Sequence, residues 1–554
     1  MSVHISAGTI RNSFATVLLL LHAWIVFDLS RRMSATYNES SHIVAGLACW
    51  HTGAYHFYNV NPPLPRMVST AILLLDPELD LEALRRIQHI PGTRDEREVG
   101  MFFADTNASR FHRIVCLARL AGVFWVTLGG IVVWRWACIL FGPDGGLLAL
   151  GLWTFEPTVT AHAALVTGDV PGMVMGLAAS LAFWAAMRSG SYFHSVATGI
   201  LLGLALLCKF TLVLLLPAWS VAWLLVLRSR DQYAILALPL FAQLRRSVVV
   251  GFLAWATLNS WYEFRGTGTR IGDLQFFSKS FQESPFVQNS LARAIPLPLP
   301  TDFVLGMDLQ QRDFEGALSS YLFGEWRSHG WWYYYVYAFV IKSPFGHLAV
   351  YFLAVIIAMR WRTSIPVLLW LIPAILIAIA SMKSGYTNSL RYLLPAYPFI
   401  FIMSGCVVSF PTIPMFEYRK WMSAILVCYS AGSMWSTYPN SLGYFNESVG
   451  GVENGWRYLA GSNVDWGQDW IALRKWLDTH PNSRPIKLSL VGVVDPIVYL
   501  GQRFPAPDPF MSGYAVVDAQ SLTGSYPWLL KHPIVGRIGA SIFVFEVRPA
   551  VKPG

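Results

Sequence analysis

The feature that most constrains this chain is a series of long apolar runs that are nearly free of charged residues. A helix needs about 20 mostly apolar residues to cross the hydrocarbon core of a bilayer. Only 13% of the 554 residues are charged, against about 25% in an ordinary globular chain, so these runs cannot all be core helices of a soluble protein. Eleven runs qualify, at residues 12–29, 120–138, 147–166, 170–187, 191–208, 210–227, 247–262, 343–359, 363–381, 392–410 and 421–437. The sequence therefore predicts an α-helical polytopic membrane protein with about eleven transmembrane helices, surrounded by membrane lipids.

The distribution of Lys and Arg predicts how the chain is oriented. Short cytoplasmic loops hold the excess of these residues. With the N-terminus in the cytoplasm, nine of them fall in short cytoplasmic connections and only Lys209, Lys383 and Arg391 in short outer ones; Arg31 and Arg32 count the other way. We expect a multi-pass protein of the cytoplasmic membrane with its C-terminus outside. The net charge of +9 then reflects cytoplasmic loops, and no nucleic acid partner is expected.

This orientation leaves three long segments outside the membrane. They are a first outer loop at 30–119, a long outer loop at 263–342 and a tail at 438–554. The tail combines a predicted helix at 468–479 with β-like runs at 486–494 and 540–547. We therefore expect a transmembrane module over 1–437 and a C-terminal extracytoplasmic α/β domain over 438–554.

Carboxylates beside the membrane are costly to keep there and are the first candidates for chemistry. Glu39 and His42 follow the first run and are three residues apart, which places them on one helix face. They are typical of a general base or metal ligand, or of a capped, solvated helix start. Asp169 lies in a tight outer turn before Pro171. There it either takes part in the same chemistry or caps the N-terminus of the following helix. Two such carboxylates could share a divalent cation or divide the base and orienting roles.

The outer cations form a second group of candidates. Lys209, Lys383 and Arg391, together with Lys342 at the end of the long outer loop, run against the charge bias. The Arg guanidinium, with two parallel N–H donors, and the Lys ammonium could bind a phosphate at the membrane surface. Alternatively, these side chains could extend to the lipid headgroups. The chain has no nucleotide-binding or zinc motif. An enzyme for lipid-linked substrates, a transporter and a structural membrane component remain open.

Several motifs point to a known family. They lie, in chain order, at residues 38–42, 61–64, 165–169, 203–210, 330–334, 342–344, 390–395, 444–447 and 462–469. Taken together, they resemble those of bacterial polyprenyl-phosphate-dependent glycosyltransferases of the GT-C fold, relatives of protein O-mannosyltransferases and of the lipid A aminoarabinose transferase. The resemblance covers most of the chain.

The resemblance implies a GT-C-like bundle that moves a sugar, with inversion, from a polyprenyl-phosphate donor to a hydroxyl acceptor on protein, lipid or glycan. The reaction would take place at the outer face of the cytoplasmic membrane. It implies an acidic general base in the first outer loop. No cofactor is required because the donor is already activated, although a divalent metal ion at Glu39 and Asp169 stays an alternative. A transporter or flippase of lipid-linked sugars, and a catalytically inactive relative, are the rival hypotheses.

Carried onto this chain, the family's acidic pair falls at Asn38 and Glu39, so Asn38 stands where the family often has Asp. We therefore expect Glu39 to be the base, Asp169 to orient it, and Asn38 and His42 to support it. Roles at the donor phosphate are expected for a further set of residues, in which Tyr392 supports the cations: Arg391, Lys209, Lys342, Lys383 and Tyr392.

Overall fold

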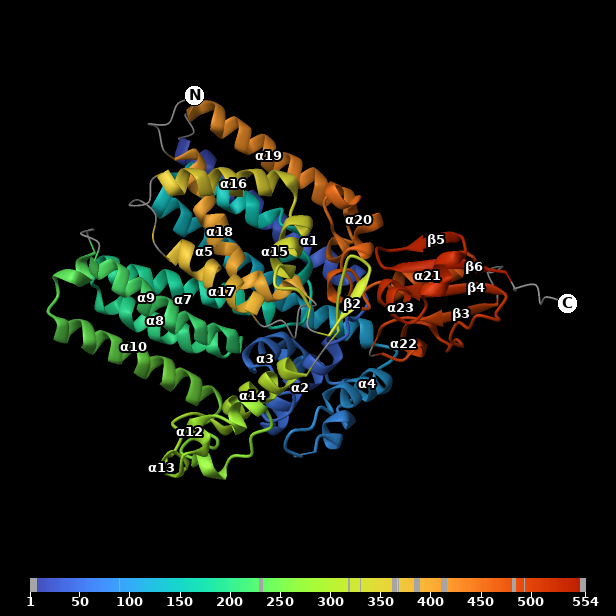
Figure 1. Ribbon diagram of the computed structural model, residues 1–554, viewed down its shortest axis with the longest axis horizontal. Helices are drawn as coiled ribbons and strands as arrows, with labels where there is room; N and C mark the ends of the chain where they lie inside the picture. Colours follow the sequence, from blue (N-terminus) through green and yellow to red (C-terminus); the bar gives the residue numbers. More distant parts are fainter. Residues whose placement is uncertain are drawn as a thin grey trace.

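The chain folds into a mostly helical body with a small α/β region at its C-terminal end (Figure 1). The computed structural model describes residues 7–88, 90–228, 233–316, 319–328, 330–360, 366, 368–382, 389–409, 416–480, 485–492 and 494–548. Both parts of the predicted fold class, the apolar helical bundle and the α/β tail, are confirmed.

Apolar helices of different lengths build the body, and each predicted run overlaps at least one of them. They are α1 (Ala7–Arg32), α5 (Phe111–Thr154), α6 (Pro157–Ala163), α7 (Asp169–Ser189), α8 (Tyr192–Leu206), α9 (Leu215–Arg228), α10 (Leu240–Trp261), α15 (Tyr334–Lys342), α16 (Phe345–Arg360), α17 (Leu368–Met382), α18 (Tyr397–Ser404) and α19 (Phe416–Thr437). Within the described ranges, five helical spans are long and apolar enough to cross a membrane, or six if α15 and α16, bent by 120°, count as one. The protein is a multi-pass membrane protein.

The predicted runs 120–138 and 147–166 lie on either side of a break inside α5. α5 has 44 residues and breaks at Gly142, whose φ of +73° suits a residue without a Cβ. Pro143 follows directly and is tolerated there because the first turn after a break needs no amide donor. α5 ends at Thr154, and α6 continues the second run to Ala163.

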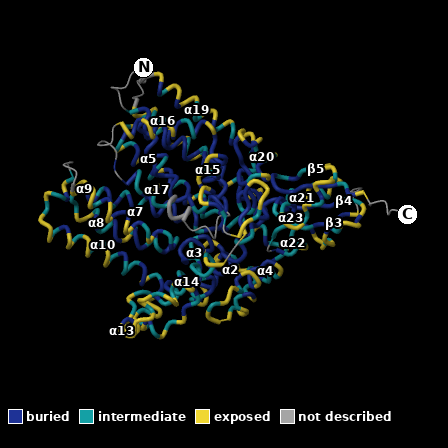
Figure 2. Tube along the Cα trace, in the orientation of Figure 1, coloured by how far each residue is buried: buried dark blue, intermediate teal, exposed yellow. Residues whose placement is uncertain are grey.

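The two long segments that the sequence predicts outside the membrane, which we call the outer segments and together the outer layer, fold against one side of the body. Residues 30–119 form α2 (Glu39–Thr52), α3 (Leu64–Thr70) and α4 (Glu96–Thr106), and residues 263–342 contribute α14 (Thr301–Glu315). Figure 1 shows these four helices grouped beneath the bundle, and Figure 2 shows α2 almost wholly buried. Val44 of α2, Phe103 of α4 and Leu309 of α14 belong to one apolar cluster. The outer segments are therefore a folded layer rather than connectors.

A four-stranded sheet forms the centre of the C-terminal region. Its strands are β3 (Ile486–Ser489), β4 (Gly513–Asp518), β5 (Ile534–Ile538) and β6 (Ile542–Val547), in the order β3-β4-β6-β5. β3 and β4 are parallel, and the other neighbours are antiparallel. The predicted helix is α21 (Trp470–Thr479), whose Leu473 packs with Val516 and Val544 of the sheet.

The segment before α21 holds the residues that lead into α2. The amide of Tyr37 donates to the Trp466 carbonyl at 2.8 Å, and the Ser34 hydroxyl donates to the Gly467 carbonyl at 2.8 Å. The Trp470 amide returns a hydrogen bond to the Ser34 oxygen at 2.9 Å. Because these bonds are buried, the C-terminal region fixes the backbone from which the first outer segment begins.

Candidate active site

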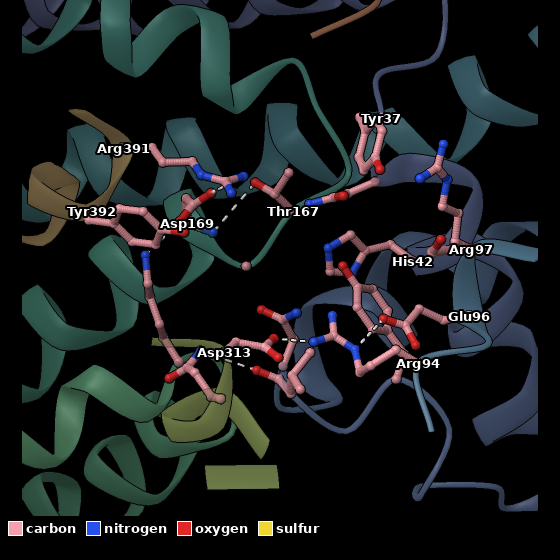
Figure 3. A pocket seen from close by; sticks show the side chains of 18 of the residues that line it. Tyr37, His42, Arg94, Glu96, Arg97, Thr167, Asp169, Asp313, Arg391 and Tyr392 are labelled. Carbon is pink, nitrogen blue, oxygen red and sulfur yellow. Dashed lines mark hydrogen bonds and ion pairs between the residues drawn. The ribbon is translucent and has the colours of Figure 1, made fainter. Parts of the chain in front are cut away.

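A cavity of about 330 Å³ opens between the outer layer and the ends of the apolar helices (Figure 3). Seven of its nineteen lining residues are charged, which is far above the 13% of the whole chain, so the cavity is built for a polar ligand. The charged ones are Arg94, Glu96, Arg97, Asp169, Lys209, Asp313 and Arg391. The others are Tyr37, Asn38, Ser41, His42, Tyr58, Val60, Asn61, Thr167, Gly168, Gln310, Phe314 and Tyr392.

One end of the cavity carries an excess of positive charge around Asp169, the first residue of α7. Lys209 Nζ lies 2.5 Å from Asp169 Oδ1, and an Arg391 terminal nitrogen lies 3.8 Å from Oδ2. The Arg391 guanidinium also stacks 4.3 Å from the Trp466 ring centre, and Lys209 Nζ lies 5.6 Å from the Tyr392 ring centre. Two cations thus share one carboxylate. We call Asp169, Lys209, Arg391 and Tyr392 the cationic end.

The local backbone explains why these side chains meet. Lys209 has an extended backbone and connects α8 to a short 3₁₀-helix. Arg391 lies in the 3₁₀-helix Leu390–Ala396, which precedes α18. The tight turn at Gly168 starts α7 and aims Asp169 at both. Their side chains are only 9 to 14% exposed, so the ion pairs are partly desolvated and stronger than surface pairs.

The other end of the cavity is formed by the outer layer, and its charges balance. Arg94 Nε lies 2.7 Å from Glu96 Oε1, and a terminal nitrogen of Arg94 bonds Asp313 of α14. Arg97 stacks 4.9 Å from the Tyr37 ring centre. Burial alone would lower the pKa of Arg94, but attraction to the carboxylates of Glu96 and Asp313 is the stronger effect, so the pKa is raised. For Glu96 burial dominates, and it raises the pKa despite Arg94. Figure 3 shows Glu96 and Arg97 on the side opposite Arg391 and Asp169.

Asn38 and His42 line the cavity from the start of α2 in the outer layer. The His42 ring lies 4.8 Å from the Tyr58 ring, centre to centre. Burial lowers the pKa of His42 to about 3, so its imidazole is neutral at neutral pH. Asn38 also lines the cavity. Its amide can orient a ligand but cannot accept a proton as a carboxylate does.

Glu39, the predicted base, is not among the residues that line the cavity. Its carboxylate is fully buried and accepts five hydrogen bonds: two from Arg119 at 2.8 and 2.6 Å, two from Thr36 at 2.7 and 2.9 Å, and one from the Val166 amide at 2.8 Å. Burial alone would raise the pKa of Glu39, but the Arg119 guanidinium outweighs it and lowers the pKa. A carboxylate so placed holds the first outer segment to α5 through Arg119.

The residues also do not fit the divalent metal ion considered for Glu39 and Asp169. Each of these carboxylates is engaged by its own cation, Glu39 by Arg119 and Asp169 by Lys209. Among the residues that the structure describes, no group of three or more His, Cys, Asp or Glu side chains could hold a metal. Hard divalent cations need several oxygen ligands, and this arrangement does not offer them.

Two predicted phosphate ligands are not part of the cavity as described. Lys342 is buried, and its ammonium donates to the Leu442 carbonyl at 2.9 Å and the Asn463 carbonyl at 2.5 Å. It therefore ties α15 to the segment that leads into the C-terminal region, and its role at the donor phosphate stays a prediction. Lys383 lies outside the described residues. Asn38, His42, Asp169, Lys209, Arg391 and Tyr392 are brought together as expected.

Sequence reasoning missed the outer-layer end of the cavity. Arg94, Glu96 and Arg97 belong to a run of five consecutive charges at 94–98, which is unusual in so apolar a chain and is the signal that could have found them. Gln310 and Asp313 lie on α14. No motif near them pointed to the site, because only folding brings α14 to α4.

Comparison with known proteins bears on one part of this arrangement. Residues 111–255 match the family of dolichyl-phosphate-mannose-protein mannosyltransferases. The match confirms, for this segment, the resemblance to polyprenyl-phosphate-dependent glycosyltransferases of the GT-C fold. It spans well under half of the chain, runs from α5 into α10, and includes Asp169 and Lys209.

Solved structures of ArnT from Cupriavidus metallidurans are similar over most of their length. The structure bound to undecaprenyl phosphate has 12% sequence identity and a TM-score of 0.48, with 96% of this chain and 97% of that chain covered. The structure in the apo state has the same identity and coverage and a TM-score of 0.40. No curated protein sequence matches the chain significantly.

Proposed function

We propose that this protein is a glycosyltransferase that moves a sugar from a polyprenyl-phosphate donor to a hydroxyl acceptor in the cavity described above. The observation that carries the proposal is the cationic end, where Lys209 and Arg391 share Asp169 at the mouth of apolar helices. A polyprenyl chain needs an apolar surface, and its phosphate needs cations at the edge of that surface. The family match over residues 111–255 supports the same class of reaction.

The cationic end suits a phosphate that leaves during transfer. As the bond between sugar and phosphate breaks, negative charge grows on the phosphate oxygens, and preorganised cations lower the energy of that state. The Arg391 guanidinium can donate two parallel hydrogen bonds to a phosphate, and the Lys209 ammonium adds a compact positive charge. Their two positive charges exceed the single negative charge of Asp169. Asp169 is then a positioning residue that keeps both cations in place before the donor enters.

The side of the membrane follows from the segments that line the cavity. Asn38, Glu96 and Asp313 come from the two long segments that the charge distribution puts outside the cytoplasm. We therefore propose that transfer takes place on the outer face of the cytoplasmic membrane, with the N-terminus inside and the C-terminal region outside. The acceptor is a hydroxyl of a protein, lipid or glycan, and the activated donor makes a further cofactor unnecessary.

The test is release of polyprenyl phosphate from a panel of polyprenyl-phosphate sugars by the purified protein in lipid nanodiscs, with a membrane extract as the source of acceptor. We expect release from one donor, and a decrease of about 100-fold or more in Arg391→Gln, the size seen when one donor to a developing oxyanion is lost. Arg188→Gln is the matched control, because Arg188 lies in the last turn of α7, remote from Asp169 at its first residue.

Two outcomes would count against the proposal. Equal release by wild type and Arg391→Gln would remove the cationic end from the reaction. No release from any donor by well-folded protein would favour an inactive relative, or a transporter if lipid-linked sugar crosses the bilayer unchanged.

A further inference from the structure

The cavity needs a proton acceptor, and the two residues at the family's acidic pair cannot supply it. This inference rests on the proposed function. A hydroxyl is a poor nucleophile unless a base takes its proton during attack. Asn38 carries no carboxylate, and the Glu39 carboxylate is buried under five hydrogen bonds. The base must therefore come from elsewhere in the cavity.

Geometry restricts where that base can lie. In a transfer with inversion, the acceptor attacks the anomeric carbon from the side opposite the leaving phosphate. If the phosphate occupies the cationic end, the base belongs at the outer-layer end. Asp169 is excluded because it lies at the cationic end and is bound there by Lys209 and Arg391.

The outer-layer end offers two carboxylates and one imidazole. Asp313 is 31% exposed, and it contacts Arg94 and also lies 4.0 Å from Arg312. Glu96 is only 7% exposed, and among the described residues Arg94 is the one side chain that donates to it. His42 is kept neutral, and burial makes it a weaker base than a free imidazole.

We propose that Glu96 is the catalytic base that takes the proton from the acceptor hydroxyl. Arg94 holds one of its oxygens at 2.7 Å, and Asp313 of α14 holds Arg94 from the other side, so the carboxylate is fixed between two helices of the outer layer. Figure 3 shows this Asp313–Arg94–Glu96 chain ending beside His42, across the cavity from Arg391. Burial raises the pKa of Glu96 and makes it a stronger base than an exposed carboxylate.

The step balances in protons and electrons. The acceptor oxygen forms a bond to the anomeric carbon while the bond from that carbon to the phosphate oxygen breaks. The phosphate leaves with the electron pair and is received by Lys209 and Arg391. Glu96 takes the hydroxyl proton, becomes a neutral acid, and later gives the proton to water.

The experiment compares Glu96→Gln with Glu98→Gln, an exposed carboxylate in the same first turn of α4. We expect Glu96→Gln to slow single-turnover transfer by about 10²- to 10⁴-fold, the usual contribution of general base catalysis, with the affinity for polyprenyl phosphate unchanged. Glu98→Gln should transfer at the wild-type rate. Azide, a nucleophile without a proton, should restore donor cleavage in Glu96→Gln and yield the glycosyl azide.

The outcomes separate this inference from the proposed function. Transfer by Glu96→Gln within about threefold of wild type, while Arg391→Gln is inactive, would overturn the role of Glu96 and leave the glycosyltransferase standing. Absence of transfer in wild type itself would overturn both. If Glu96→Gln has a lowered melting temperature, the test uses Glu96→Asp instead, because Asp keeps the carboxylate that pairs with Arg94. A folded Asp variant that has lost activity and that azide does not rescue would also overturn the inference.

Discussion

Replacing Glu39 by Gln should destabilise the protein rather than only stop its chemistry. Gln keeps one carbonyl oxygen but turns the other acceptor into an NH₂ group, which would face donors of Arg119 and Thr36. It also leaves the Arg119 guanidinium buried without its anion. Breaking a buried ion pair from one side costs about 3–5 kcal/mol. Three backbone carbonyls, at 2.7 to 2.8 Å, still accept from Arg119, so we expect a loss near the lower value, about 3 kcal/mol.

Thermal unfolding of the purified protein in detergent measures this loss as a lower melting temperature. Acid provides a second readout, because the folded-state pKa of Glu39 lies below its ordinary value of 4.5. Its contribution is full above about pH 4.5 and is lost as the pH falls through the folded-state pKa. That part of the acid sensitivity should be missing from Glu39→Gln. The double variant Glu39→Met/Arg119→Met should recover much of the stability, since it removes both buried charges.

One result would refute this reasoning. If Glu39→Gln melts with the wild type and yet has lost all transfer activity, then Glu39 acts on the substrate, and its burial against Arg119 is not the working state. Full stability together with full activity would equally contradict the energetic role given to the pair.

Three further changes test other parts of the structure. Lys342→Met removes two buried hydrogen bonds to carbonyls, and we expect a lower melting temperature by thermal unfolding, with the transfer rate of the folded protein retained. A Cβ at Gly122 would lie 1.8 Å from a carbonyl oxygen of α6, so Gly122→Ala should also lower the melting temperature, while Gly251→Ala, with nothing within 4 Å, should not. Trp466→Ala removes the ring stacked on Arg391, and we expect polyprenyl phosphate titrations to give an affinity about 2- to 30-fold weaker, which corresponds to 0.5–2 kcal/mol.

The sequence predicted well what depends on charges beside apolar runs. Such runs are interrupted or ended by Asp169, Lys209 and Arg391. A charge at the end of a membrane helix is costly to bury in lipid, so it pairs with another charge or lines a polar cavity. The helices of the body were predicted from the length of these apolar runs. The break at Gly142 lies between the predicted runs 120–138 and 147–166, where Gly-Pro predicts an interruption of the helix.

The roles of the other carboxylates depend on partners far away in the chain. Glu39 and Arg119 are 80 residues apart, and no spacing rule joins them. Glu96 and Asp313 meet through Arg94 only because folding brings the start of α4 near the end of α14. The motif at 38–42 therefore predicted residues of the cavity, Asn38 and His42, but could not predict that Arg119 pairs with Glu39.

The central claim is that the cationic end holds the phosphate of a polyprenyl-phosphate donor. Titration of polyprenyl phosphate into the protein in nanodiscs, with the uncharged polyprenol as control lipid, tests it most directly. We predict saturable binding that polyprenol does not compete for, lost in Lys209→Gln/Arg391→Gln and kept in Arg188→Gln. Undiminished binding by the double variant, or equal binding of polyprenol, would contradict the account.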